Sequence, residues 1–145
     1  IKMLQRFHLA QGNDGSSYHA MALTELRNGR KRSHWIWFVL PQLRGLGRSA
    51  MAQRYGLDGL GEARAYLADP LLRQRLEQVI DVIHHQLLQP DQTLERLMGG
   101  ELDATKTISS LTLFEAAGLA SATTLLNHLG RRCAWTQTQL NALNR

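Results

Sequence analysis

Residues 69–87 read DPLLRQRLEQVIDVIHHQL, and no other stretch indicates the fold class so clearly. Its apolar residues recur at spacings of three and four, which is the period of one face of an α-helix, at Leu72, Leu76, Val79, Ile80, Ile83 and Leu87. Asp69-Pro70 is a start signal, because proline in the first helical position loses no hydrogen bond that the helix needs. The stretch therefore predicts a long helix that begins at Pro70 and ends before Pro90.

Shorter helical patterns precede and follow this stretch, separated by glycine, proline and polar residues. Spacing and capping residues predict helices at about residues 3–10, 17–28, 34–40, 49–55, 58–67, 93–98, 103–117, 121–129 and 135–143. Ser49, Asp58 and Asp103 are expected to cap three of them. The chain shows no internal repeat, low-complexity tract or linker. We therefore predict a single all-α domain over residues 1–145, a compact orthogonal bundle of about six to eight helices.

The run of apolar residues at 34–40 is compatible with two structures. Six apolar residues in a row could form a buried strand, but no second segment is comparably rich in β-branched or aromatic residues. Ser33 can serve as an N-cap, and Pro41 prevents the helix from continuing far. We therefore predict a short buried helix here.

Composition limits the classes of function. The 145 residues are enough to bury a core without disulfides or metals. A net charge of +5 and a pI of about 10.0 favour anionic partners in general. The lone Cys133 excludes an internal disulfide and suits a reducing compartment. No apolar run approaches the ~18–20 residues of a membrane span, so we expect a cytoplasmic protein without a membrane partner. The sequence does not indicate an oligomeric state.

Residues 29–42 read GRKRSHWIWFVLPQ and concentrate cations beside aromatic rings. Arg30, Lys31 and Arg32 lead through His34 into two tryptophans. Cations bind phosphates and ring faces stack on flat ligands, so this composition is typical of a site for a phosphorylated or aromatic molecule. The free N–H groups at the start of the expected helix would add to such an anion site. The alternative is a solvated basic turn followed by tryptophans that pack in the core.

A second polar concentration lies at residues 103–112. On a helix, Asp103, Lys106 and Ser110 share a face, and Ser109 adjoins it. Hydroxyls beside a lysine can hold a polar ligand, but serine and threonine can also hydrogen-bond to carbonyls of their own helix. The loop Gly45–Ser49 has small residues before a helix start, as phosphate loops do, but it lacks the ending of a P-loop and is more typical of an interhelix turn.

The histidines and the cysteine do not predict a metal site. His84 and His85 are adjacent on a helix and point about 100° apart, so they cannot jointly hold one ion. The chain has no His-x-x-x-His or Cys-x-x-Cys pair, and we predict neither a metal nor a cofactor. His34 is the candidate for general acid or base chemistry beside Lys31, and its alternative role is capping or packing. Whether the protein is an enzyme stays open.

Several of these segments together resemble the signature of an uncharacterised bacterial family, a domain of unknown function that is sometimes labelled calpastatin. The matching segments are residues 29–42, residues 45–55 (GLGRSAMAQRY), residues 62–67 (EARAYL) and the polar positions of residues 103–114. The resemblance implies a compact, mainly helical domain of about this length, with no known activity, substrate or cofactor. Two features depart from the family pattern: Asp69 precedes Pro70 in place of a frequent histidine, and the tail at residues 130–136 differs.

These observations support three hypotheses of function. The first is a pocket for a small phosphorylated or nucleotide-like anion, with His34 for any chemistry and a ligand-binding set of Lys31, Arg32, Trp35, Trp37, Gln42, Lys106, Ser109 and Ser110. The second is a nucleic-acid-binding module with a continuous basic face that includes Arg27, Arg30, Arg32, Arg44 and Arg48. The third is a protein-interaction domain with an exposed apolar patch and no small ligand, built on Trp35, Trp37 and Trp135.

Overall fold

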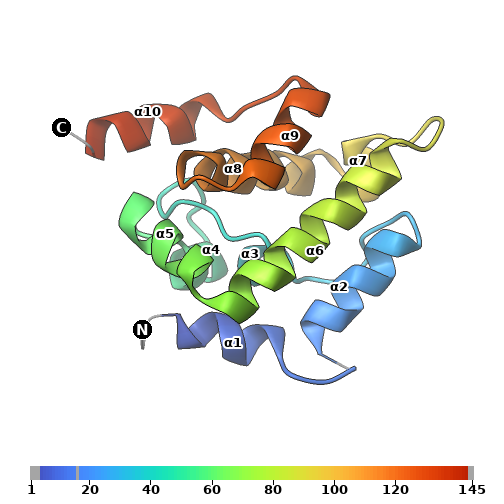
Figure 1. The fold of residues 1–145 in the computed structure, drawn as a ribbon, viewed down its shortest axis with the longest axis horizontal. Coiled ribbons are helices and arrows are strands. Elements are labelled where there is room, and N and C mark those ends of the chain that lie inside the picture. The colour runs from blue at the N-terminus through green and yellow to red at the C-terminus, as the bar shows by residue number, and fades with distance from the viewer. Residues whose placement is uncertain (1–3, 16, 144–145) are drawn as a thin grey trace.

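A computed structural model describes residues 4–15 and 17–143, and these residues form ten helices packed into a compact bundle (Figure 1). The helices are α1 (Gln5–Gln11), α2 (Tyr18–Arg27), α3 (Ile36–Val39), α4 (Ala50–Tyr55), α5 (Leu60–Ala68), α6 (Pro70–Leu87), α7 (Leu94–Leu97), α8 (Glu101–Ala116), α9 (Ala120–Leu129) and α10 (Ala134–Leu143). Within the described ranges no strand occurs beyond one parallel bridge between Leu43 and Leu57. The all-α class is confirmed.

Helix α6 forms as predicted and organises one side of the bundle. The Asp69 carboxylate accepts hydrogen bonds from the backbone N–H groups of Leu71 and Leu72, both at 3.1 Å, and Pro70 occupies the first turn. The apolar stripe of α6 is buried as far as Ile83. That stripe packs against α2, α5 and α9 (Figure 1). Burial of this face is the main stabilising contribution of the helix, because isolated helices are marginal in water.

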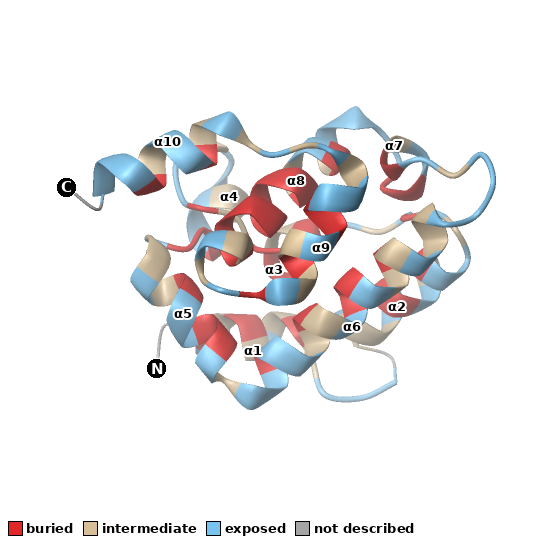
Figure 2. Cartoon of the chain, turned by 45° about the horizontal axis from the view of Figure 1, so that its top comes forward, coloured by how far each residue is buried: buried red, intermediate tan, exposed pale blue. Residues whose placement is uncertain are grey.

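Helix α8 runs through the middle of the bundle. All of its residues from 107 to 114 are buried, as the red ribbon in Figure 2 shows. It contacts α3, α5, α7, α9 and α10. The Thr107 and Thr112 hydroxyls donate to the carbonyls of Asp103 and Ile108, four residues earlier, at 2.8 and 2.7 Å. These bonds satisfy hydroxyls that would otherwise be costly to bury.

Two sequence predictions about the helices are wrong. All ten predicted segments are helical, so the estimate of six to eight helices was too low, because it did not count single turns such as α3 and α7. The predicted caps Asp58 and Asp103 do not cap. Helix α5 follows Gly59, and α8 follows Gly100, which places Asp103 inside the first turn of α8. The Asp103 carboxylate is therefore available for other partners.

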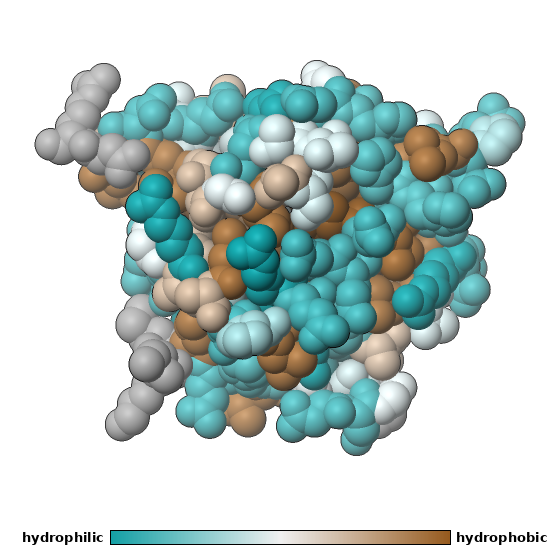
Figure 3. Space-filling model, in the orientation of Figure 1, coloured by the Kyte–Doolittle hydropathy of each residue, from teal (hydrophilic) through white to brown (hydrophobic). Residues whose placement is uncertain are grey.

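Apolar residues at the surface are dispersed. Figure 3 shows one face that is mostly hydrophilic, with separate apolar areas. The large exposed hydrophobic residues come from several elements: Leu9, Tyr18, Met21, Leu71, Leu88, Leu102 and Leu143. Trp35, whose place in an apolar run already argued against its exposure in the protein-interaction hypothesis, is fully buried, and Trp37 and Trp135 are partly buried. No helix of the described residues is long and apolar enough to cross a membrane.

Candidate functional site

The basic turn before α3 folds around the carboxylate of Glu25, which belongs to α2. Glu25 Oε1 accepts from the backbone N–H groups of Arg32 and Ser33 at 2.8 and 2.9 Å and from the Trp35 indole at 2.9 Å. The Ser33 hydroxyl donates to Glu25 Oε2 at 2.5 Å. The expected N-cap role of Ser33 is therefore wrong: α3 begins at Ile36 without a side-chain cap, because the Ser33 side chain is held by Glu25. The turn does bind an anion, and that anion is a residue of the chain.

These hydrogen bonds stabilise the ionised form of Glu25. Burial raises the pKa of this carboxyl, but the bonds from the Ser33 hydroxyl, the Arg32 and Ser33 backbones and the Trp35 indole outweigh burial and lower the pKa to about 2. A carboxyl with a depressed pKa stabilises the fold above its unfolded pKa and loses that contribution as the pH falls through its folded pKa. Glu25 should therefore contribute fully above about pH 4.5 and progressively less towards pH 2.

We expect the wild-type protein to lose roughly 2 kcal/mol more stability than Glu25→Gln between pH 5 and pH 2.5. The glutamine variant has no carboxyl to titrate at this position, and other carboxyls with depressed pKa values, such as Asp69, Glu95 and Glu115, titrate in both proteins. Urea unfolding followed by circular dichroism at the two pH values measures the difference. Equal losses in both proteins would contradict the assigned role of Glu25.

A second charge cluster joins the basic turn to α8. Asp103 Oδ2 lies 2.7 Å from Lys31 Nζ, and Asp103 Oδ1 lies 3.4 Å from Lys106 Nζ. Each ammonium also lies over an indole: Lys31 is 5.0 Å from a Trp35 ring centroid and Lys106 is 5.1 Å from a Trp37 ring centroid. Two lysines from distant parts of the chain therefore share one carboxylate and face two neighbouring tryptophans. Lys31 and Lys106 lie close together, as the first hypothesis requires, whereas Ser110, which that hypothesis places in the same cleft, is fully buried.

The two lysines differ in their exposure to solvent. The Lys31 side chain is 6% exposed, and its ammonium also donates to the Ser33 carbonyl at 2.6 Å. The Lys31 backbone N–H bonds to the Leu97 carbonyl, so this residue is fixed at both ends. The Lys106 side chain is 22% exposed and has a longer ion pair. Lys31 therefore holds the turn in place, whereas Lys106 can contact a molecule from solvent.

Trp37, whose ring lies against the Lys106 ammonium, lines a narrow pocket together with Gln42. Its other lining residues are Leu43, Gly47, Ala52, Tyr55 and Gly56. Its volume of about 10 Å³ is enough for about one water molecule. The Gln42 side-chain amide has no hydrogen-bond partner among the residues that the structure describes. Any larger ligand must therefore lie over the mouth of this pocket.

Glycines hold the loop at residues 44–49 close to its neighbours. A Cβ atom on Gly47 would lie 2.8 Å from the Ala52 Cβ, so the loop and α4 approach as closely as they do only with glycine there. Gly45 has φ +107°, and a Cβ at Gly45 would lie 3.4 Å from the Trp135 ring. The loop that borders the pocket is thus packed in place on two sides. Its geometry is that of an interhelix turn.

The remaining predicted ligand-binding residues lie elsewhere. Ser109 and Ser110 are fully buried. The Ser109 hydroxyl is 3.1 Å from the Thr136 hydroxyl of α10, and the Ser110 hydroxyl has no partner in the described part of the chain. Arg32 and His34 are exposed. Neither serine can reach a ligand in solvent without rearrangement of α8.

Sequence reasoning missed how two carboxylates hold the basic turn. Asp103 was placed on the same helix face as Lys106, a spacing that favours an ion pair, but it was not linked to Lys31, and Glu25 was not linked to Ser33 or Trp35. No local pattern connects either carboxylate with Lys31 or Ser33. The contact between His8 and Asp69, with Nε2 2.7 Å from Oδ2, also had no counterpart in the sequence analysis.

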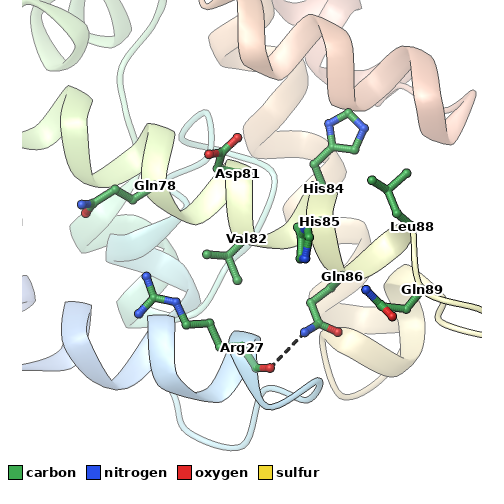
Figure 4. Close-up of a pocket in the computed structure, with 9 residues that line it drawn as sticks. All are labelled: Arg27, Gln78, Asp81, Val82, His84, His85, Gln86, Leu88 and Gln89. Carbon is green, nitrogen blue, oxygen red and sulfur yellow. Dashed lines mark hydrogen bonds between the residues drawn. The ribbon is translucent and has the colours of Figure 1, made fainter.

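A more spacious pocket lies elsewhere, along α2 and α6 (Figure 4). Its volume is about 650 Å³, and its lining is polar, with Arg27, Gln78, Asp81, His84, His85, Gln86 and Gln89 beside Val82 and Leu88. Figure 4 shows Asp81 and His84 pointing away from Arg27, so the charged groups do not converge. The one hydrogen bond drawn there joins the Gln86 amide to the Arg27 carbonyl at 3.0 Å. This arrangement does not indicate a reaction.

The described residues contain no group of three or more histidine, cysteine, aspartate or glutamate side chains placed to hold a metal ion. His84 and His128 lie against each other, with ring centroids 5.1 Å apart. Two tilted imidazoles without a third ligand are an aromatic contact and do not make a zinc site, which needs at least three protein ligands.

Comparison with known proteins agrees with this fold. The profile of a family described as a protein of unknown function, DUF1810, matches residues 2–140. No curated protein matches the chain. The chain is similar to the conserved hypothetical protein Rv1873 from Mycobacterium tuberculosis, whose crystal structure has 38% sequence identity and a TM-score of 0.83, over 95% of this chain and 96% of that one. The chain therefore belongs to the DUF1810 family of proteins of unknown function.

Proposed function

We propose that the protein binds a small phosphorylated, nucleotide-like anion over Lys106, Trp37 and Gln42. The observation that carries this proposal is the position of the Lys106 ammonium, which is accessible to solvent and lies 5.1 Å from a Trp37 ring centroid. The ammonium would bind the phosphate, and the adjacent indole would stack on a flat ring. The Gln42 amide can both donate and accept, so it would bind polar groups at the edge of that ring.

The distribution of charge supports an anionic ligand. Lys31 and Lys106 are balanced by Glu25 and Asp103, so the excess positive charge of the basic turn rests on Arg30 and Arg32. Both arginines are exposed, and their guanidinium groups have no ion-pair partner within residues 4–15 and 17–143. Because no carboxylate of the described residues neutralises them, Arg30 and Arg32 make the electrostatic potential of the basic turn more positive, which favours an anion.

The proposal differs from the first hypothesis in the residues that touch the ligand. Lys31 and Trp35 hold the site in place and do not contact the ligand, because their polar groups already have partners in the fold. The Lys31 ammonium bonds to Asp103 and to the Ser33 carbonyl, and the Trp35 indole bonds to Glu25. Ser109 and Ser110 are buried in α8 and contribute packing. His34 is exposed with no partner in the described part of the chain, and no carboxylate orients it as a general base. We therefore propose binding and assign no reaction.

Adenosine monophosphate is a suitable probe, since it combines a phosphate with a flat ring. We expect it to shift the Trp37 indole N–H resonance, with a Kd of about 1 mM or lower. Adenosine and inorganic phosphate should each bind at least about tenfold more weakly, because each lacks one half of the interaction. Two-dimensional 1H–15N NMR measures these shifts, and a Trp37→Phe variant assigns the resonance.

Lys106→Met should weaken binding of adenosine monophosphate by at least about tenfold, since it removes the charge that contacts the phosphate. Arg73→Met is the matched control, because Arg73 is an exposed cation on α6 whose partner is Glu77. It should bind the probe as the wild type does. No shift of Trp37 at about 10 mM probe, or equal loss of binding in both variants, would contradict the proposal. A larger, steeply salt-dependent shift with an oligonucleotide would favour the nucleic-acid alternative instead.

A further inference from the structure

A pocket between α1 and the end of α5 combines apolar side chains with one oriented histidine. Leu4, Gln5 and His8 of the α1 region form one wall, and Ala65, Ala68 and Asp69 at the end of α5 form the other. Its volume of about 570 Å³ lies within the range of small-molecule pockets. Ala65 and Ala68 are three residues apart, so they share a face of α5, and their small side chains leave the space open.

Contacts outside the pocket hold its two walls together. The Arg6 guanidinium bonds to the carbonyls of Arg54 and Gly56, at 2.9 and 3.0 Å, and forms an ion pair with Glu62 at 3.3 Å. The Gln11 amide donates to the Tyr66 hydroxyl of α5 at 3.0 Å. Helices α1 and α5, which are neighbours in Figures 1 and 2, are therefore fixed relative to each other. The pocket exists before any ligand enters.

The polar group of this pocket is a histidine oriented by a carboxylate. Asp69 Oδ1 accepts from the backbones of Leu71 and Leu72, and Asp69 Oδ2 lies 2.7 Å from His8 Nε2. An ionised carboxylate only accepts hydrogen bonds, so Nε2 carries the proton and donates it to Asp69. In the neutral imidazole, Nδ1 is then an acceptor. Nδ1 has no hydrogen-bond partner among the described residues.

We propose that this pocket binds a small apolar molecule that carries a hydroxyl group, with its O–H donating to His8 Nδ1. The lining favours an apolar body, because Leu4, Ala65 and Ala68 offer no polar side-chain atoms and Gln5 is the one polar residue beside His8 and Asp69 among the described lining residues. The acceptor selects a hydroxyl over a cation, since Nδ1 of a neutral imidazole accepts a hydrogen bond and the Asp69 oxygens already hold three donors. This site shares no residue with the proposed anion site and does not depend on it.

Phenol and toluene make a matched pair of probes, because they differ by the hydroxyl. At about pH 8.5, where free imidazole is neutral, we expect both to shift the amide resonances of residues around the pocket. Phenol should bind about fivefold more tightly, which is the effect of one net hydrogen bond. His8→Phe keeps an aromatic ring without the nitrogens, and it should reduce phenol binding to the level of toluene. Titrations followed by 1H–15N NMR give all four affinities.

Ala65→Leu tests the apolar half of the proposal. It fills the space between the walls and should weaken both probes by at least about tenfold. Ala116→Leu, at an exposed alanine at the end of α8, is the control and should leave both affinities unchanged. Equal affinity for toluene and phenol in the wild type would overturn the proposal. Unchanged phenol binding by Ala65→Leu would overturn it as well, even if His8→Phe failed to fold.

Discussion

Glu25→Ala is expected to lower the free energy of unfolding by about 3–5 kcal/mol. The Glu25 carboxylate accepts four hydrogen bonds from three residues of the basic turn, and bonds to a charged group contribute about 1.5–3 kcal/mol each before solvent replaces some of them. The indole N–H of Trp35 would be left without a partner inside the fold, because this tryptophan is fully buried. Domains of this size have total stabilities of about 5–15 kcal/mol, so a large share would be lost.

Glu77→Ala is the control for this measurement. Glu77 lies on α6 with a side chain that is 45% exposed, and it pairs with Arg73 four residues earlier, so its removal should cost at most about 0.5 kcal/mol. Chemical denaturation of the two variants at pH 7 compares them directly. A loss of less than about 1 kcal/mol in Glu25→Ala would show that solvent replaces the carboxylate and that the turn does not depend on it.

Lys31→Met should cost about 3 kcal/mol, although methionine keeps much of the length and apolar volume of the side chain. The variant removes a nearly buried ammonium that bonds to Asp103 at 2.7 Å and to the Ser33 carbonyl at 2.6 Å. In this variant the Asp103 carboxylate keeps one lysine partner, Lys106, at the longer distance of 3.4 Å. Breaking a buried ion pair from one side is costly because the remaining charge stays desolvated.

A double-mutant cycle separates the ion pair from packing. Lys106→Met, on the partly exposed lysine, should cost at most about 1 kcal/mol. Lys31→Met combined with Asp103→Asn should recover part of the loss, because the double variant leaves no unpaired carboxylate, and the ammonium that loses Asp103, that of Lys106, is partly exposed. The coupling energy between Lys31 and Asp103 should therefore reach about 1–3 kcal/mol. Thermal or urea unfolding of the single and double variants measures it. Strict additivity would mean that Lys31 acts through packing on Trp35 alone.

Helix positions could be predicted because their causes are local. In α6, the spacing of apolar residues and the Asp69-Pro70 start signal can each be recognised from a few neighbouring residues. The helix begins at Pro70, as predicted. Ser49 caps α4 as expected, accepting from the Ala52 N–H at 3.1 Å. Predictions failed where a cap candidate had a distant partner. Ser33 bonds to Glu25, and Asp58 pairs with Arg44, so neither carries out the local role that its position suggested.

The candidate site could be predicted in part. The concentration of cations and tryptophans in residues 29–42 pointed to the region in which we propose the site, and Lys106 lies beside Trp37. Which lysine is accessible could not be predicted, because exposure depends on the helices that surround each side chain. Lys31 lies between the turn and α8, and Lys106 lies at the edge of the same cluster. For Ser109 and Ser110 of α8, too, the sequence could not show whether solvent reaches the hydroxyl groups, because their exposure depends on the helices that pack around α8.

Local sequence patterns account for the all-α class, the long helix α6 and the basic, aromatic character of the turn, because helix periodicity, capping and composition act over a few residues. Packing of the helices was needed to bring Glu25 into the turn, to pair two lysines with Asp103, and to place His8 against Asp69. Each of these contacts joins residues from different elements. Their partners are chosen by helix packing, and burial then makes those hydrogen bonds and ion pairs strong enough to fix the geometry of the sites.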